Sequence, residues 1–471
     1  MNDSQFLSVP QQAGSPQGQQ SNFQTRDNYP EFIFDSYKVE RTVNGLHAVF
    51  IYKLGEHSFE PTVDIPIAEI SNDWINDDYL NELFFNFGIV NAINYYKLSL
   101  APKFTINCGS LDNRQKEFFK KLFYNGLGEL MFKNNLLMPY ENFMEISAPA
   151  PAQKREFHFD DNFKGNLITV GGGKDSIITL EALRSSRDQN LCMQFNRDLY
   201  PENQAAIDCI HLAGYSTEQI CNFNLSIDKK VIELNKAGFY NGHVPFSGML
   251  AFACAIVAYL NNLKYIVVSN EASANEGNIA GTTINHQYSK SYEFEQDFEK
   301  YQNEYLCPHI HYFSLLRCLN EFEIVQKFIK FPSYLKVFRS CNVGTKTNSW
   351  CGHCAKCLYV YIMLYPFVSK ERLIEIFGRD LLDDETMGQI FYSLINPDTT
   401  KPFECVGTRE EINYSIKCAI EDENAPKPLP KLLEWYRTSY NYNPTIQYNI
   451  AQYYNAEHNI PEPYLKALLS L

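Results

Sequence analysis

The stretch Asn166-Leu-Ile-Thr-Val-Gly-Gly-Gly-Lys-Asp-Ser176 decides the fold of the middle of this chain. Its first five residues form a short apolar strand pattern, and a helical pattern follows to about Ser186. The three glycines between them let backbone amides approach an anion, and the helix adds the positive end of its dipole. A tight turn is the structural alternative, but three glycines and a charged triplet exceed what a turn needs. The stretch therefore predicts a phosphate-binding loop.

Downstream of the loop, strand and helix patterns alternate. Strands are expected at 191–195, 219–223 and 265–269, and helices at 202–213 and 246–262. Such alternation gives a parallel sheet with right-handed crossovers, which binds ligands beyond the carboxyl ends of its strands. The sequence therefore predicts an α/β fold with the ligand site at the edge where the glycine loop lies.

The chain before the loop shows a different order of predicted elements. Residues 1–24 are rich in Gln, Ser, Pro and Gly, and we expect a disordered tail. Short strands are expected within 31–67, followed by helices at 74–98 and 113–134. This order predicts an N-terminal α+β domain that ends at the linker Ala148-Pro-Ala-Pro-Ala152. The domain carries no recognisable motif, and its expected role is to hold or cover a substrate.

Composition and charge restrict the class of partner. The 471 residues carry a net charge of −14, which disfavours nucleic acid, because binding to its backbone relies on Lys and Arg. The longest apolar run, Met249–Leu260, is about half of the roughly 20 residues that a bilayer helix needs. The first residues lack the basic start and apolar stretch of a signal peptide. We expect a cytoplasmic protein that neither binds nucleic acid nor inserts into membranes.

Four of the 13 cysteines are crowded into Cys341-x9-Cys351-x2-Cys354-x2-Cys357. This spacing can supply four thiolates in a tetrahedron, the geometry of a closed structural zinc site. An iron–sulfur cluster is the second possibility, and unrelated reduced thiols are the third. His353 lies inside the motif, but four cysteines suffice without it. The motif predicts a structural Zn²⁺.

The glycine loop fits one family of phosphate loops better than the others. The Walker pattern fails at Ile168 and Asp175, and the dinucleotide pattern needs glycine where Ser176 stands. The order of strand, Gly-Gly-Gly-Lys-Asp-Ser and helix resembles the PP-loop of ATP pyrophosphatases, which cleave ATP between its α- and β-phosphates. The resemblance assigns phosphate contacts to the amides of Gly171, Gly172 and Gly173 and to Ser176, charge compensation to Lys174, and ordering of the loop or a Mg²⁺ to Asp175. The family usually begins this loop with Ser, where the present chain has Gly171.

The resemblance also organises the chain. Similar cysteine runs follow the nucleotide domain in PP-loop enzymes that make 7-cyano-7-deazaguanine, so the loop and the cysteine motif support each other. The expected segments are a tail (1–24), an N-terminal α+β domain (25–150), a PP-loop domain like those of adenine nucleotide α-hydrolases (160–335), and a zinc-stapled helical region (336–471).

Polar side chains crowd the segment between the loop and the cysteines. The stretches 270–278 and 285–291 follow the strand expected at 265–269. Such density after a parallel strand is typical of an active-site edge, and a solvated loop is the alternative. Further along, Glu295 is expected on a solvated helix face, and upstream His243 either borders the pocket or packs as a cap.

Four motifs together resemble one narrower family. GGGKDS at 171–176, SNEASANEGN at 269–278, NHQYSKS at 285–291 and the cysteine motif are similar to those of MurL, the bacterial UDP-N-acetylmuramoyl-L-alanyl-L-glutamate epimerases. The resemblance spans about residues 165–360. It implies inversion of the terminal L-glutamate of UDP-MurNAc-L-Ala-L-Glu with ATP and Mg²⁺, for peptidoglycan synthesis.

Adenylation explains why an epimerase would carry such a loop. The glutamate amine is already an amide, so a Schiff base cannot form, and the free carboxylate opposes removal of the α-proton. In an acyl adenylate the carboxyl group no longer carries the charge, which makes this proton acidic enough for a side-chain base, with release of AMP and pyrophosphate. Under this hypothesis the base and acid are sought among Glu271, Glu276 and His286, and Lys290 neutralises a phosphate or carboxylate.

Two other functions stay open on the sequence. A PP-loop ligase or thiolase would adenylate another carboxylate or a base and then trap the adenylate with ammonia or sulfur. No glutaminase or sulfur-carrier motif is apparent, although a cysteine such as Cys254 or Cys307 could serve. A non-enzymatic, zinc-stapled interaction module is disfavoured by the intact Lys-Asp-Ser triplet.

Overall fold

The computed structural model describes residues 25–67, 75–152, 157, 162–279, 284–423, 427–440, 450 and 453–471. The tail expected at 1–24 lies outside these residues. Among the helices that are described, none combines the length and the apolar character needed to cross a membrane.

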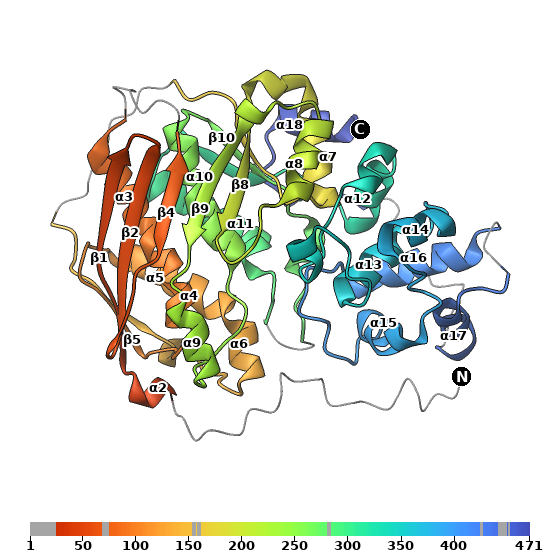
Figure 1. Ribbon diagram of the computed structural model, residues 1–471, viewed down its shortest axis with the longest axis horizontal. Coiled ribbons are helices and arrows are strands. Elements are labelled where there is room, and N and C mark those ends of the chain that lie inside the picture. Colours follow the sequence, from red (N-terminus) through yellow and green to blue (C-terminus); the bar gives the residue numbers. More distant parts are fainter. Residues whose placement is uncertain are drawn as a thin grey trace.

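One mixed sheet of 11 strands organises the described part of the chain (Figure 1). Its strands are β1 (Glu31–Thr42), β2 (Gly45–Leu54), β3 (His57–Phe59), β4 (Thr62–Pro66), β5 (Lys103–Ile106), β6 (Glu145–Ser147), β7 (Asn166–Thr169), β8 (Asn190–Arg197), β9 (Ile220–Ser226), β10 (Tyr265–Val268) and β11 (His311–Ser314). They lie in the order β11-β10-β7-β8-β9-β4-β2-β1-β5-β6, with β3 beside β2. The strands from β11 to β9 are parallel, which confirms the predicted α/β class.

The sheet continues across the boundary predicted near residue 150. Strand β4 pairs antiparallel with β9, with Val63 opposite Leu225. The N-terminal strands thereby cover the edge that β9 would otherwise expose. Pairing between strands 160 residues apart leaves no local trace in a sequence, so the shared sheet was not predicted.

The parallel strands are buried on both faces. In β7, Leu167 belongs to one apolar core and Ile168 to a second core, and in β10 Ile266 and Val267 divide in the same way. This follows from the alternation of side chains along a strand. Continuous apolar runs such as these are what a doubly covered parallel sheet requires.

Helices from different parts of the chain cover the two faces. On the face of Leu167 lie α3 (Asp77–Asn91), α5 (Asn113–Gly126), α10 (Phe246–Leu260) and α11 (Tyr292–Tyr305). On the face of Ile168 lie α7 (Lys174–Ala182), α8 (Gln204–Leu212), α12 (Glu321–Phe328) and α18 (Glu462–Leu469). Figure 1 shows the remaining C-terminal helices beyond α7 and α12, away from the N-terminal strands. They are α13 (Ala355–Leu364), α14 (Lys370–Phe377), α15 (Gly388–Ile395), α16 (Arg409–Glu421) and α17 (Lys431–Ser439).

Two predicted helices are each divided in the structure. The helix expected at 74–98 is α3 followed by the short α4 (Ile93–Tyr96), and that expected at 113–134 is α5 followed by α6 (Gly128–Lys133). Leu127, with φ −101° and ψ 7°, separates α5 from α6. The remaining short helices are α2 (Thr25–Asn28) and α9 (Lys230–Lys236).

The strand order places a topological switch point between β7 and β10. The connection from β7 through α7 leads to β8 on one side, whereas α10 returns the chain to β10 on the other side. Ligands of open α/β sheets bind at such a point, beyond the carboxyl ends of the two strands. The loop Gly171–Gly173 and the polar segment that begins at Ser269 both start there.

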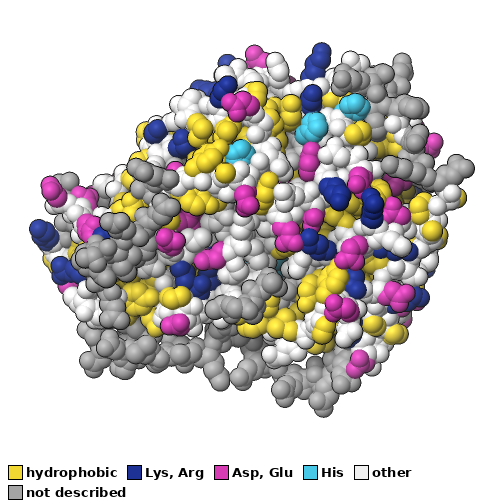
Figure 2. Space-filling view, turned by 180° about the vertical axis from the view of Figure 1, so that it is seen from behind, with side chains coloured by type: hydrophobic (Ala, Val, Ile, Leu, Met, Phe, Trp, Pro, Cys, Tyr) yellow, Lys and Arg dark blue, Asp and Glu magenta, His cyan; other side chains and the backbone are white. Residues whose placement is uncertain are grey.

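The surface carries charges of both signs. On the face that Figure 2 shows, Lys and Arg side chains lie among Asp and Glu side chains rather than in one continuous field. The whole chain has 55 acidic and 41 basic residues.

Candidate functional site

The glycine loop turns tightly between β7 and α7. Gly172 has φ +82°, and a Cβ there would lie 2.8 Å from the backbone nitrogen of Ala206. Its carbonyl accepts a hydrogen bond from Arg339 N at 2.8 Å, and the carbonyl of Gly171 accepts one from Asn203 Nδ2 at 3.1 Å. These contacts fix the loop and direct its carbonyls toward the protein.

Helix α7 begins directly after the loop. Gly173 is its N-cap and supplies no side-chain hydrogen bond, and a Cβ at Gly171 would meet no atom within 4 Å. Ser176 is buried, and its hydroxyl donates to the carbonyl of Gly173 at 2.9 Å. A nine-residue helix whose start has no side-chain cap, beside open space, is suited to an anion.

Three carboxylates meet where β7, β10 and β11 lead out of the sheet. Asp175, Glu271 and Glu321 each offer an oxygen within 4.8 Å of the others, and the ammonium of buried Lys174 is paired with Asp175 and Glu321. Burial acts to raise the pKa of Asp175, but Lys174 and other lysines outweigh it and lower this pKa. Burial raises the pKa of Glu321, against the pull of Lys174. When ionised, three carboxylates carry more negative charge than one ammonium neutralises, and their remaining oxygens can serve as ligands of a divalent cation.

Glu321 was missed because it lies seven residues beyond a strand that the sequence did not predict. Asn320 and Glu323 form a capping box that starts α12 and fixes the neighbouring Glu321. The backbone nitrogen of Glu321 donates to Glu411 Oε1 at 2.7 Å. Burial and the nearby Glu321 carboxylate raise the pKa of Glu411 to about 7.

The polar segment after β10 is held by buried partners. Arg317 donates to the carbonyls of Glu271 and Lys290, both at 2.6 Å, and pairs with Glu295 at 3.0 Å. The Glu295 side chain is 1% exposed, so the prediction of a solvated Glu295 is wrong. The helical pattern around Glu295 does not show that Arg317, from a segment further along the chain, packs against this side chain.

A second segment crosses the polar one. Asn278 Nδ2 donates to the carbonyl of Pro402 at 3.0 Å, and the backbone nitrogen of Lys401 donates to the carbonyl of Asn278 at 3.0 Å. The buried Lys401 ammonium forms an ion pair with Glu276. These contacts bring residues 401–405 to the edge where the candidate catalytic residues lie.

His286 lies against an acidic residue from the N-terminal segment. Its Nδ1 is 2.5 Å from Glu129 Oε2, and its ring centroid is 3.9 Å from that of His243. Burial lowers the pKa of His286, but Cys405 and Glu129 outweigh it and raise this pKa to about 9. Burial, helped by the neighbouring His286, lowers the pKa of His243 to about 3. His286 is therefore a cation at neutral pH, and His243 is neutral.

Lys290 lies beside a cysteine, Cys405, and its charge also interacts with two of the three carboxylates described above. Its Nζ lies 3.2 Å from Cys405 Sγ, and the negative charges of Cys405, Glu271 and Asp175 raise its pKa against the effect of burial. Burial acts to raise the pKa of Cys405, but Lys290, His286 and other positive charge lower it to about 5. Cys405 was missed because it lies in an irregular stretch between α15 and α16 without a motif.

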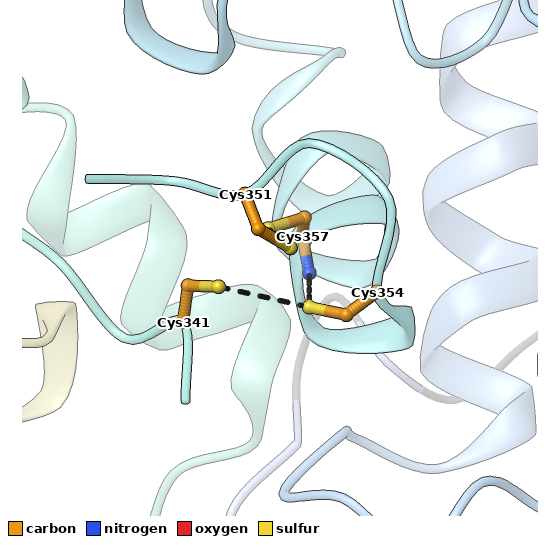
Figure 3. Close-up of side chains that lie close together, drawn as sticks. All are labelled: Cys341, Cys351, Cys354 and Cys357. Atoms are coloured by element: carbon orange, nitrogen blue, oxygen red, sulfur yellow. Dashed lines mark hydrogen bonds between the residues drawn. The ribbon is translucent and has the colours of Figure 1, made fainter. Parts of the chain in front are cut away.

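The four motif cysteines surround one small volume (Figure 3). Sγ of Cys341 is 3.8 Å from that of Cys354, and Sγ of Cys351 is 3.7 Å from that of Cys357. Zinc–sulfur bonds of about 2.3 Å in a tetrahedron place sulfurs about 3.8 Å apart. All four sulfurs lie within 4.8 Å of one another, which suits a single ion. A multi-iron cluster would bind its thiolates through different irons and separate them further.

The cysteine cluster lies next to the glycine loop. Arg339 and Ser340 directly precede Cys341; the first donates to Gly172, and Ser340 Cβ is 3.4 Å from where a Gly173 Cβ would lie. Stabilising the cluster therefore also holds the segment that supports the loop.

Comparisons with known proteins identify relatives over most of the chain. The family model described as "MurL N-terminal domain" matches residues 23–315, and that described as "MurL C-terminal domain" matches residues 337–431. A Xanthomonas oryzae pv. oryzae protein named UDP-N-acetyl-alpha-D-muramoyl-L-alanyl-L-glutamate epimerase is 32% identical over 77% of this chain and 80% of its own length. Proteins of the same name from a Micromonospora strain (32% identical, 93% of this chain, 97% of its own) and from Salinispora tropica (31%, 81% and 82%) are also similar.

Proposed function

The chain belongs to the MurL family, and we propose that it inverts the terminal L-glutamate of UDP-N-acetylmuramoyl-L-alanyl-L-glutamate to D-glutamate. The printed names of three relatives support this substrate and this reaction class. We further propose that ATP activates the glutamate α-carboxylate as an acyl adenylate, with release of pyrophosphate and, after hydrolysis, AMP.

The glycine loop supports the use of ATP. The start of α7 has no side-chain cap. Gly172 has a positive φ, and a Cβ at this position would collide with the backbone of Ala206, so the loop needs glycine there. Phosphate oxygens would be held by amides of Gly171–Gly173 and α7, and Lys174 would compensate their charge. Because Lys174 is already paired with two carboxylates, it is held in place before any nucleotide binds.

The three carboxylates support a Mg²⁺ site. Asp175, Glu271 and Glu321 supply the hard oxygen ligands that Mg²⁺ prefers, and the remaining positions would be filled by phosphate oxygens and water. Bound there, the ion would neutralise the phosphates of ATP. This assignment gives Glu271 a metal-binding role instead of the role of catalytic base.

The four cysteines support a structural Zn²⁺. Their spacing fits one tetrahedral ion, and backbone nitrogens of Gly344 and Cys357 lie 3.2 Å from Cys341 Sγ and 3.4 Å from Cys354 Sγ. Such N–H groups stabilise thiolates, the form that binds metal.

The switch-point site carries this proposal, because the glycine loop and a buried carboxylate triad converge there with the polar segment. The test is to incubate purified protein with ATP, Mg²⁺ and UDP-MurNAc-L-Ala-L-Glu, separate nucleotides by ion-pair chromatography, and determine glutamate chirality after acid hydrolysis. AMP together with D-glutamate is expected. ADP as the main product, or unchanged L-glutamate, would contradict the proposal.

A further inference from the structure

Epimerisation needs a base that removes the glutamate α-proton. The surroundings of the acidic and histidine side chains near the site make each of them poorly suited to this role. Glu276 is paired with the buried Lys401. His286 is already protonated at neutral pH beside Glu129, and burial makes His243 a weak base. Glu271 belongs to the carboxylate triad around Lys174.

Cys405 differs from the other cysteines outside the four-cysteine motif. Burial raises the pKa of the other eight: Cys108, Cys192, Cys209, Cys221, Cys254, Cys307, Cys318 and Cys418. At Cys405 burial acts in the same direction, but three cationic residues lie around it and outweigh this effect. Lys290 Nζ lies 3.2 Å from its Sγ, His286 hydrogen-bonds its side chain, and Lys356 of α13 binds its carbonyl oxygen.

We propose that Cys405 is the base that removes the α-proton of the activated glutamate, with its thiolate held by Lys290 and His286. This inference rests on the proposed epimerase function. The C–H bond breaks, the S–H bond forms, and the C–H electron pair moves into the enolate of the acyl adenylate. A proton from water or a protein acid on the opposite face then gives the D-isomer, and the thiol returns its proton to solvent.

The position of Lys290 connects this base to the activation site. Lys290 Nζ lies 3.2 Å from Cys405 Sγ, and its charge also interacts with the carboxylates of Asp175 and Glu271. The thiolate is the resting form at neutral pH, so it needs no prior deprotonation. Residues 401–405 are also hydrogen-bonded to the polar segment through Asn278, which keeps Cys405 at this edge.

The group of Glu129, His243 and His286 also has ligand types that bind metals. We assign this group to binding a proton and not a metal ion. Lys133 already pairs with Glu129, and the positive charge of Lys290 acts on His243.

The test separates activation from proton removal. ATP–pyrophosphate exchange with the L-glutamate substrate reports adenylation, and deuterium incorporation at the glutamate α-carbon in heavy water reports proton removal. We expect Cys405→Ala and Cys405→Ser to lose deuterium incorporation by about 100-fold or more while exchange stays within a few-fold of wild type. Cys418→Ala is the matched control, because Cys418 is also partly buried and lies in α16 away from these groups; it should retain both activities.

A chemical readout keeps the proposal testable if these variants fold poorly. Iodoacetamide should alkylate Cys405 of the wild-type protein with a midpoint near pH 5, and Lys290→Met should move this midpoint upward. Near-normal deuterium incorporation in Cys405→Ala, or alkylation of Cys405 only above about pH 8 as for an ordinary thiol, overturns the assignment of the base. If the wild-type protein itself shows neither ATP–pyrophosphate exchange nor deuterium incorporation, the proposed epimerase function is refuted instead.

Discussion

Replacing Gly172 by alanine tests whether the glycine loop holds ATP. The residue has φ +82°, and its new Cβ would lie 2.8 Å from Ala206 N and 3.1 Å from the carbonyl carbon of Ala205. The left-handed conformation alone costs an L-residue about 1–2 kcal/mol. The contact with backbone of α8 adds to this cost, because neither neighbour is a flexible side chain that can turn away.

Gly378 provides the matched control. It ends α14 with φ +83°, the same conformation, but a Cβ there meets no atom within 4 Å. Gly378→Ala should therefore lower the free energy of unfolding by about 1–2 kcal/mol and leave turnover unchanged. The difference between the two variants isolates the steric displacement of the loop from backbone strain.

Steady-state kinetics with varied ATP, together with urea unfolding, measures both effects. A loop displaced by a few tenths of an ångström or more should lower kcat/KM for ATP by about 10- to 100-fold in Gly172→Ala, because phosphate contacts depend on close positioning. Wild-type kcat/KM for ATP in a folded Gly172→Ala protein would refute the assignment of this loop to the nucleotide.

Three further predictions concern the charged groups and the metal. Elemental analysis should find one zinc per chain, and Cys354→Ser should lose it and unfold at lower urea concentration than Cys418→Ser; iron, or no metal, would contradict the zinc assignment. Lys174→Met should lower the free energy of unfolding by about 3–5 kcal/mol, since it leaves buried Glu321 unpaired; unchanged stability would mean that the pair is not formed. The raised pKa of His286 stabilises the fold fully below about pH 6.5, and this contribution, on the order of 3 kcal/mol, is lost as pH rises through about 9. Urea unfolding at pH 6 and pH 9.5 should therefore show a larger deficit for His286→Asn at pH 6, and an equal deficit at both would refute the raised pKa.

Local pattern was enough to place the glycine loop and the four cysteines. The loop is set by neighbouring residues in β7 and α7, and three of the four cysteines lie within seven residues of one another. Periodicity also located β7, β8, β9 and β10, because their apolar runs are bounded by loops. Strand β11 was missed, and with it the start of α12 where Glu321 lies.

The rest of the site depends on contacts between distant segments. Glu129 lies 157 residues from His286, and Cys405 lies 115 residues from Lys290. No motif surrounds Glu129 or Cys405 in the sequence, and the N-terminal segment that contains Glu129 was expected to carry no chemistry. The mispredicted exposure of Glu295 has the same origin, because its partner Arg317 belongs to another element.

Solvent exchange at the substrate tests the central claim most directly. In heavy water with ATP, Mg²⁺ and UDP-MurNAc-L-Ala-L-Glu, the product D-glutamate should carry one deuterium at its α-carbon, and without ATP there should be none. Mass spectrometry of the hydrolysed product, with the stereoisomers separated, gives both quantities. AMP formation with the α-hydrogen retained would contradict the epimerase account and indicate a ligase that adenylates the same carboxylate.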